Sequence, residues 1–120
     1  MNAALIVSHG SRSPQTKREV KQLLNRIRAA NPVDILEFAF LEIESPSIPE
    51  GIASCVRQGA GHVIVALNFL NAGKHVDKDI PRIIAAAKKK YPQVRFSLTR
   101  PVGQHAKLVG LFRDMIRQCL

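Results

Sequence analysis

The sequence predicts an α/β fold, in which a four-stranded parallel sheet is flanked by helices and a strand–helix unit occurs four times. Two observations support this prediction. Short apolar runs alternate with longer amphipathic segments along the chain, and residues typical of turns and helix ends separate them. The length of 120 residues fits one compact domain, which we expect to span residues 1–120.

The first unit begins with residues 3–7, a continuous apolar run typical of a strand that is covered on both faces. Pro14 then suits the first turn of a helix. Apolar residues recur at helical spacing from Val20 to Ile27, and Asn31-Pro32 is expected to end this helix.

The other three units follow the same pattern of a short apolar run and an amphipathic segment. Strands are predicted over residues 34–42, 62–67 and 94–98. The helices that follow them carry apolar faces over residues 48–56, 80–87 and 104–119. Because right-handed crossovers connect such units, all four strands are expected to run parallel.

The chain is strongly basic, with eighteen Lys and Arg against nine Asp and Glu and a formal net charge of +9. Such a balance attracts polyanions, which include nucleic acid and small molecules with several carboxylates. The six aromatic residues fall mostly in apolar runs, so an aromatic platform for single-stranded nucleic acid is not evident. Alternatively, the excess charge only solvates the outer faces of helices.

The sequence predicts a cytoplasmic protein without a membrane span. No apolar run approaches the roughly 18 to 20 residues that a transmembrane helix needs. The first residues lack the basic segment of a signal peptide. Cys55 and Cys119 are far apart and form no C-x-x-C pattern, so we interpret both as reduced structural residues.

Three ionisable side chains lie at or beyond the carboxyl ends of the first three predicted strands: His9, Glu42 and His75. Ligands of open parallel sheets bind beyond the carboxyl ends of the strands, so these residues are expected at the binding edge. Neutral imidazole binds Fe, Co, Ni, Cu and Zn, and it takes up protons near neutral pH. A closed structural zinc site normally has four protein ligands. The three residues therefore predict an open site that holds a metal ion briefly and releases it.

A structural interpretation stands beside this functional one. A single histidine at the end of a strand is often a capping or hydrogen-bonding group. His62 precedes its strand at the opposite edge, and His105 starts a helix, so both are assigned structural roles. Gly10 and Gly73 are assigned to backbone turns. The chain contains neither a G-x-G-x-x-G nor a Walker sequence.

Three segments together resemble the sirohydrochlorin chelatases of the CbiX/SirB family (class II chelatases), in order and spacing over nearly the whole chain. They are Ser8-His9-Gly10-Ser11-Arg12, then Phe40-Leu41-Glu42 with Ser45-Pro46-Ser47-Ile48, and Phe69-Leu70-Asn71-Ala72-Gly73-Lys74-His75-Val76 with Asp79-Ile80-Pro81. The length is similar to the short, single-domain form. The resemblance implies a chelatase-like fold, equivalent to one flavodoxin-like half, that pairs as a homodimer.

The resemblance also implies a reaction and a site. The reaction is insertion of a divalent metal, Co²⁺ first and Ni²⁺ or Fe²⁺ next, into sirohydrochlorin, a tetrapyrrole with eight carboxylates, in cobalamin- or sirohaem-type biosynthesis. His9 and His75 would hold the metal and accept the pyrrole protons, with Glu42 assisting. The metal is a substrate, and no permanently bound cofactor is implied. The residues expected around the macrocycle or its carboxylates are Ser11, Arg12, Ser45, Leu70, Asn71, Ala72, Gly73, Lys74 and Arg100.

Three other functions compete with this one. A phosphohistidine phosphatase requires an arginine before His-Gly to grip phosphate, and Ser8 stands there instead. A nucleic-acid-binding module explains the charge but not the histidines, so nucleic acid is not the expected partner. A metal carrier or tetrapyrrole-binding protein without turnover is compatible with every residue of the site.

Overall fold

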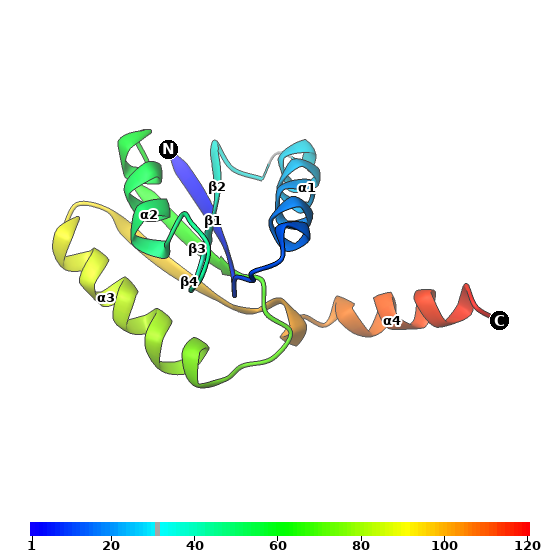
Figure 1. The fold of residues 1–120 in the computed structure, drawn as a ribbon. Coiled ribbons are helices and arrows are strands. Elements are labelled where there is room, and N and C mark those ends of the chain that lie inside the picture. Colours follow the sequence, from blue (N-terminus) through cyan, green and yellow to red (C-terminus); the bar gives the residue numbers. More distant parts are fainter. Residues whose placement is uncertain (31) are drawn as a thin grey trace.

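The computed structural model describes residues 1–30 and 32–120, with Asn31 and the side chain of His75 outside the described part. The strands are β1 (Asn2–Ser8), β2 (Ile35–Phe40), β3 (His62–Leu67) and β4 (Arg95–Pro101). The helices are α1 (Pro14–Ala30), α2 (Ile48–Arg57), α3 (Ile80–Lys90) and α4 (Lys107–Arg117), with a π-helical turn η1 (His75–Asp79) and a 3₁₀ turn η2 (Val102–Gln104). The four predicted strand–helix units are confirmed (Figure 1).

All four strands are parallel, in the order β2-β1-β3-β4. β1 therefore lies between β2 and β3. The connection from β1 runs outward to β2, and the connection from β3 runs outward to β4 on the other side. In β1, Ser8 is paired with Phe40 of β2, while Val7 is paired with Leu67 of β3. The switch point of the sheet thus lies between the carboxyl ends of β1 and β3, where open parallel sheets bind ligands.

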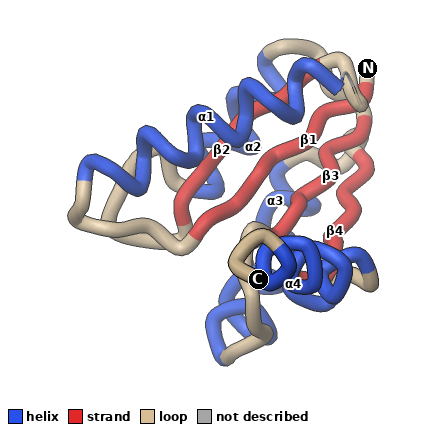
Figure 2. Tube along the Cα trace, turned by 90° about the vertical axis from the view of Figure 1, so that its right-hand side faces the viewer, coloured by secondary structure: helices blue, strands red, loops and turns tan. Residues whose placement is uncertain are grey.

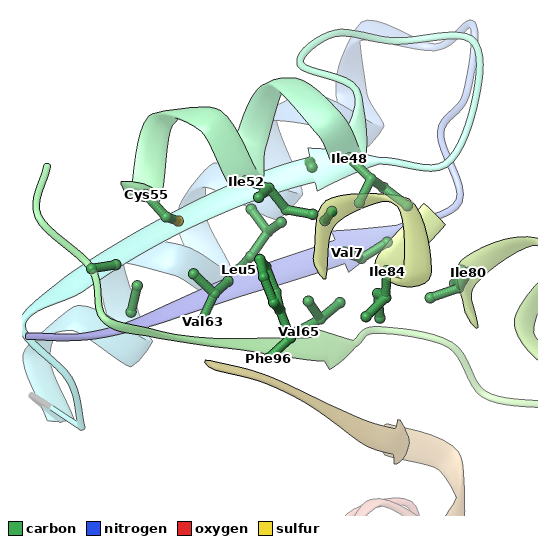
Figure 3. Packing of buried hydrophobic residues seen from close by; sticks show 14 of the residues in the cluster. Leu5, Val7, Ile48, Ile52, Cys55, Val63, Val65, Ile80, Ile84 and Phe96 are labelled. Carbon is green, nitrogen blue, oxygen red and sulfur yellow. The ribbon is translucent and has the colours of Figure 1, made fainter. Parts of the chain in front are cut away.

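The main core lies between the sheet and the pair α2 and α3. Alternate residues of the central strands, such as Leu5 of β1 and Val65 of β3, meet Ile52 of α2 and Ile84 of α3 (Figure 3). The continuous apolar run of β1 suits this position, because helices approach both of its faces. This layer fixes the direction in which β1 presents its last residues.

On the other face of the sheet, α1 lies over β1 and β2 (Figure 2). Val20 and Leu24 are the buried residues of α1, which confirms the apolar stripe predicted there. The same face of β3 is less covered, since Ile64 and Ala66 remain half-buried. A doubly covered sheet would carry another helix at this place.

α4 does not take that place. The helix predicted over residues 104–119 is formed, but it leaves the sheet at η2 and projects away from the body (Figure 1). None of its residues is buried. The projection makes the molecule 53 Å long and 31 by 29 Å across. Within the described part of the chain, no helix is long and apolar enough to span a membrane.

Candidate active site at the carboxyl edge

The pairing of β1 and β2 continues beyond the last residues of both strands. The backbone N–H of Leu41 donates to the Ser8 carbonyl at 2.9 Å, and that of Glu42 donates to the His9 carbonyl at 3.1 Å. This extended ladder aligns two side chains: His9 Nε2 lies 2.9 Å from Glu42 Oε1. Their side chains are 52% and 46% exposed, so the pair is open to a ligand. The structure thus brings His9 and Glu42 together, as their shared edge predicts.

A glycine and a tight turn make this approach possible. Gly10 has φ +105°, and a Cβ added there would lie 1.9 Å from the Glu42 carbonyl oxygen. The next turn has Ile43 at φ 71°, with the Glu44 N–H donating to the Glu42 carbonyl at 2.8 Å. Positive φ at the centre of such a γ-turn is rare and strained, above all for a β-branched residue. The strained turn presents the Glu42 carboxylate to His9.

β3 supports His9 from the opposite side. The N–H of Asn68 donates to the Val7 carbonyl at 2.8 Å, and its side-chain Nδ2 donates to Ser8 Oγ at 3.0 Å. The rings of Phe69 and His9 form a T-shaped pair, with centroids 6.3 Å apart and planes at 89°. Neither Asn68 nor Phe69 has a site role predicted from the sequence. No local sequence signal marks these two residues, because only the strand order of the folded sheet places β3 beside β1.

His75 begins η1, after the loop that follows β3. Helical structure therefore starts before residue 80, where the apolar face of the predicted helix begins. The side chain of His75 lies outside the described part, so the predicted trio of His9, Glu42 and His75 is placed only for its first two members. Among the described side chains, His, Cys, Asp and Glu nowhere gather in threes that could hold a metal ion.

One cavity near the His9–Glu42 pair is lined by three of the predicted substrate-binding residues, Ser11, Arg12 and Ser45. The cavity is about 430 Å³ and lies between the loops after β1 and β2. We call it the basic groove; its other lining residues are Ser13, Pro14, Lys17, Arg18, Lys21, Ile43 and Glu44. Ser11 N–H donates to Glu44 Oε1 at 2.8 Å and ties the two loops together.

The lysines and arginine that α1 contributes to the basic groove are not among the substrate-binding residues expected from the sequence. Lys17, Arg18 and Lys21 join Arg12 there, and none of these four cations forms an ion pair within the described part of the chain. Cations one helical turn apart lie on the same side of α1, so helical spacing was the available signal. The groove is suited to a ligand with several negative charges.

The remaining predicted residues do not line the basic groove. Leu70, Asn71, Ala72, Gly73 and Lys74 lie exposed in the loop between β3 and η1. Arg100 lies at the end of β4 and lines a different, apolar cavity. These residues share the carboxyl edge with His9, and their contact with a ligand stays a prediction.

The other two described histidine side chains have structural partners, as assigned from the sequence. His62 Nδ1 lies 3.0 Å from Arg95 Nη2, and its Nε2 lies 2.8 Å from Ser97 Oγ. His105 Nδ1 accepts from the backbone N–H of Lys107 at 3.1 Å. The fully buried Cys55 is also structural: burial, and secondarily Glu37, raises the pKa of its thiol to about 11.

Comparison with known proteins decides the family. A model of the CbiX family matches residues 3–119. The chain belongs to the CbiX family. It is 34% identical over 116 residues to the sirohydrochlorin ferrochelatase, chloroplastic, of Arabidopsis thaliana, covering 97% of this chain and 52% of that protein. It is 40% identical over 84 residues to the sirohydrochlorin cobaltochelatase of Methanococcus maripaludis, covering 70% and 58%.

A solved structure agrees with this family assignment. The sirohydrochlorin chelatase SirB from Bacillus subtilis subspecies spizizenii, in complex with cobalt, matches with a TM-score of 0.88 at 33% identity. The match covers 98% of this chain and 50% of that one. The chain therefore spans about half the length of the curated relatives it matches. The family resemblance and the parallel α/β fold expected from the sequence are both confirmed.

Proposed function

We propose that this chain inserts a divalent metal ion into sirohydrochlorin, with Co²⁺ as the first candidate and Ni²⁺ or Fe²⁺ next. The observation that carries the proposal is the half-exposed His9–Glu42 pair at the carboxyl edge of the sheet, with His9 next to the switch point. Family members named as ferrochelatase and as cobaltochelatase support the reaction class. Both cysteines are free thiols, which suits work in the reducing cytoplasm.

The reaction exchanges two pyrrole N–H protons for one dication. An imidazole can bind the incoming metal or accept a proton. The Glu42 carboxylate, 2.9 Å from His9 Nε2, stabilises positive charge on the ring in either case. His75 is proposed as the second such group. The metal enters as a substrate, and no permanently bound cofactor is needed for this exchange.

The T-shaped contact with Phe69 gives the His9 ring a defined orientation. An aromatic edge carries partial positive charge and a face partial negative charge, so edge-to-face contact is the favoured arrangement of two rings. Together with the carboxylate, this contact restricts rotation of the imidazole. A ligand that approaches from the open edge then meets a preorganised nitrogen rather than a freely rotating one.

The basic groove is proposed to hold carboxylates of the macrocycle. Sirohydrochlorin is expected to be octa-anionic, and a net charge of +9 favours its association. Arg12 offers two parallel donors to a carboxylate, while the lysines act as point charges. Since the loop at residues 42–45 carries both Glu42 and one wall of the groove, carboxylates bound there would place the macrocycle near His9.

Metal insertion is tested directly by mixing the purified chain with sirohydrochlorin and Co²⁺, Ni²⁺ or Fe²⁺ without oxygen. The absorption spectrum of the macrocycle reports the rate. We expect acceleration over the spontaneous reaction with at least one metal, and Co²⁺ to be fastest. Binding of sirohydrochlorin without acceleration by any of the three metals would contradict catalysis and favour a carrier.

The double variant Lys17→Glu, Lys21→Glu tests the basic groove. We expect KM for sirohydrochlorin to rise about tenfold at low salt, with kcat changed less, because both charges act on binding. The matched control is Lys88→Glu, Lys89→Glu in the last turn of α3, which reverses the same number of charges away from the groove. An equal rise in both proteins would show that net charge, and not the groove, attracts the substrate.

A further inference from the structure

The loop after β2 holds an isoleucine in a conformation that L-residues rarely adopt. Ile43 has φ 71°, and across it the Glu44 N–H donates to the Glu42 carbonyl at 2.8 Å. Glycine takes a positive φ without steric cost, whereas a β-branched residue is strained there. Ile43 is also 62% exposed, so it buries little of its side chain. Packing within this chain therefore does not account for an isoleucine at this position.

Contacts on both sides of Ile43 fix the backbone that carries it. Before it, the Glu42 N–H donates to the His9 carbonyl at 3.1 Å, and the Glu42 carboxylate lies 2.9 Å from His9 Nε2. After it, Glu44 Oε1 accepts a hydrogen bond from the Ser11 N–H at 2.8 Å. A side chain on a fixed backbone loses less freedom when it meets a ligand. The turn is therefore suited to present an apolar group to a bound molecule.

Ile43 lies between the candidate active site and the basic groove. It directly follows Glu42, whose carboxylate meets His9, and it lines the groove itself. Among the residues that line the groove, Pro14 and Ile43 are apolar and the others are polar or charged. A ligand that holds its anionic groups in the groove and its body near His9 would thus pass over Ile43.

A second exposed apolar side chain stands on the other side of His9. Leu70, which is 64% exposed, lies in the loop after β3. In the described parts of the loops that follow β1, β2 and β3, Ile43 and Leu70 are the large apolar residues that are mostly exposed. Because β1 lies between β2 and β3, these two loops flank His9 on strands about 10 Å apart. This span suits a flat conjugated ring that lies over His9.

We propose that Ile43, with Leu70 on the other side of His9, contacts the apolar face of a flat macrocycle whose carboxylates lie in the basic groove. Ile43 is then a specificity-determining residue. The groove attracts any polyanion, whereas burial of apolar surface adds affinity only for a ligand that has an apolar face. This role rests on the proposed function, in which sirohydrochlorin is the ligand that combines both features.

Binding of metal-free uroporphyrin, a flat porphyrin with many carboxylates, to the full chain tests this role. Ile43→Asn keeps a residue that tolerates positive φ but removes the apolar surface, so Kd should rise about tenfold at low and at high salt alike. Ile43→Val keeps an apolar side chain, and its Kd should rise less than about threefold. Lys17→Glu, Lys21→Glu should weaken binding mainly at low salt, because salt screens charge. An effect of Ile43→Asn that disappears at high salt, an unchanged Kd, or a wild-type chain that does not bind uroporphyrin would each overturn the proposal.

Urea unfolding and turnover separate this role from a structural one and from the proposed function. Ile43→Asn should unfold at a urea midpoint no lower than that of the wild type, because asparagine takes positive φ at less cost. A lower midpoint would show that Ile43 stabilises the fold and would refute the proposal. Weaker uroporphyrin binding by Ile43→Asn, with no metal insertion by the wild type, would support the contact and contradict the proposed function. Metal insertion with the same KM for sirohydrochlorin in both proteins would refute the contact alone.

Discussion

The two edges of the sheet each carry an exposed or half-exposed histidine, and their surroundings differ. At the carboxyl edge, His9 faces the carboxylate of Glu42. At the amino edge, about 20 Å away along strands of six or seven residues, His62 lies between the guanidinium of Arg95 and the hydroxyl of Ser97. A carboxylate attracts a second cation to the imidazole, whereas a guanidinium repels it. The charge of the neighbour thus distinguishes a candidate metal ligand from a structural histidine.

The largest expected difference comes from replacing each of the two histidines. His9→Ala should lower the rate of metal insertion at least about 100-fold, since general base groups contribute on this scale. His62→Ala removes only the contacts with Arg95 and Ser97, so turnover should stay within about twofold of wild type. Anaerobic absorption assays with matched thermal unfolding would measure both. Equal activities for the two variants would remove the distinction between the edges.

Gly10 and Gly73 give the second comparison, between two loops at the carboxyl edge. Gly10→Ala should destabilise the fold by at least about 2 kcal/mol, because the new Cβ meets the Glu42 carbonyl and positive φ strains an L-residue. Gly73→Ala meets nothing within 4 Å and should be near neutral. Urea unfolding measures both. Similar losses would show that the two loops are equally constrained.

The third comparison is between two carboxylates. Glu37 lies in β2, and Glu42 lies in the loop that follows β2. Glu42→Gln keeps the shape but removes the charge beside His9, and turnover should fall about tenfold. Glu37 instead accepts from Gln58 Nε2 at 2.7 Å, away from the candidate active site. Glu37→Gln should therefore leave turnover unchanged. Steady-state kinetics of the two variants decide whether charge at position 42 matters.

The smallest expected effect concerns how the loop after Glu42 is anchored. Ser47 and Glu50 form a capping box at the start of α2, and Ser47→Ala should cost about 1 kcal/mol of unfolding free energy. Hydrogen bonds from Ser47 lower the pKa of Glu50 below its usual 4.5. The Glu50 carboxylate therefore stabilises the fold above pH 4.5, and this contribution is lost as the pH falls through the lowered pKa.

Urea unfolding of wild type and Ser47→Ala at neutral and acid pH separates the contribution of the Ser47 cap from that of the Glu50 carboxylate. The variant should show a slightly weaker loss of stability below pH 4.5 than the wild type, because Glu50 loses the hydrogen bond of the Ser47 hydroxyl but keeps that of the residue-47 backbone N–H. Pro49 at the same helix start makes no such bonds, and Pro49→Ala serves as the control. Identical pH profiles in all three proteins would remove Glu50 from the acid response.

The sequence by itself determined the four strand–helix units, the family and the edge where His9 and Glu42 lie. These follow from local information, because apolar spacing sets each element and the strand that ends before a residue sets its edge. The paired carboxylate could thus be expected from its place after the second strand. The role of Gly10 as a turn residue was also visible locally, though its contact with Glu42 was not.

Only the tertiary structure decided which distant residues meet. The strand order put Asn68 and Phe69 beside His9, and the approach of two loops collected Arg12 and Lys17 in one groove. The apolar face of α4 is equally clear in the sequence, yet nothing local shows that it points away from its own sheet. That direction is set by contacts between η2, which precedes α4, and the loop after β3. Apolar spacing specifies that a surface must be covered, and only the path of the chain specifies what can cover it.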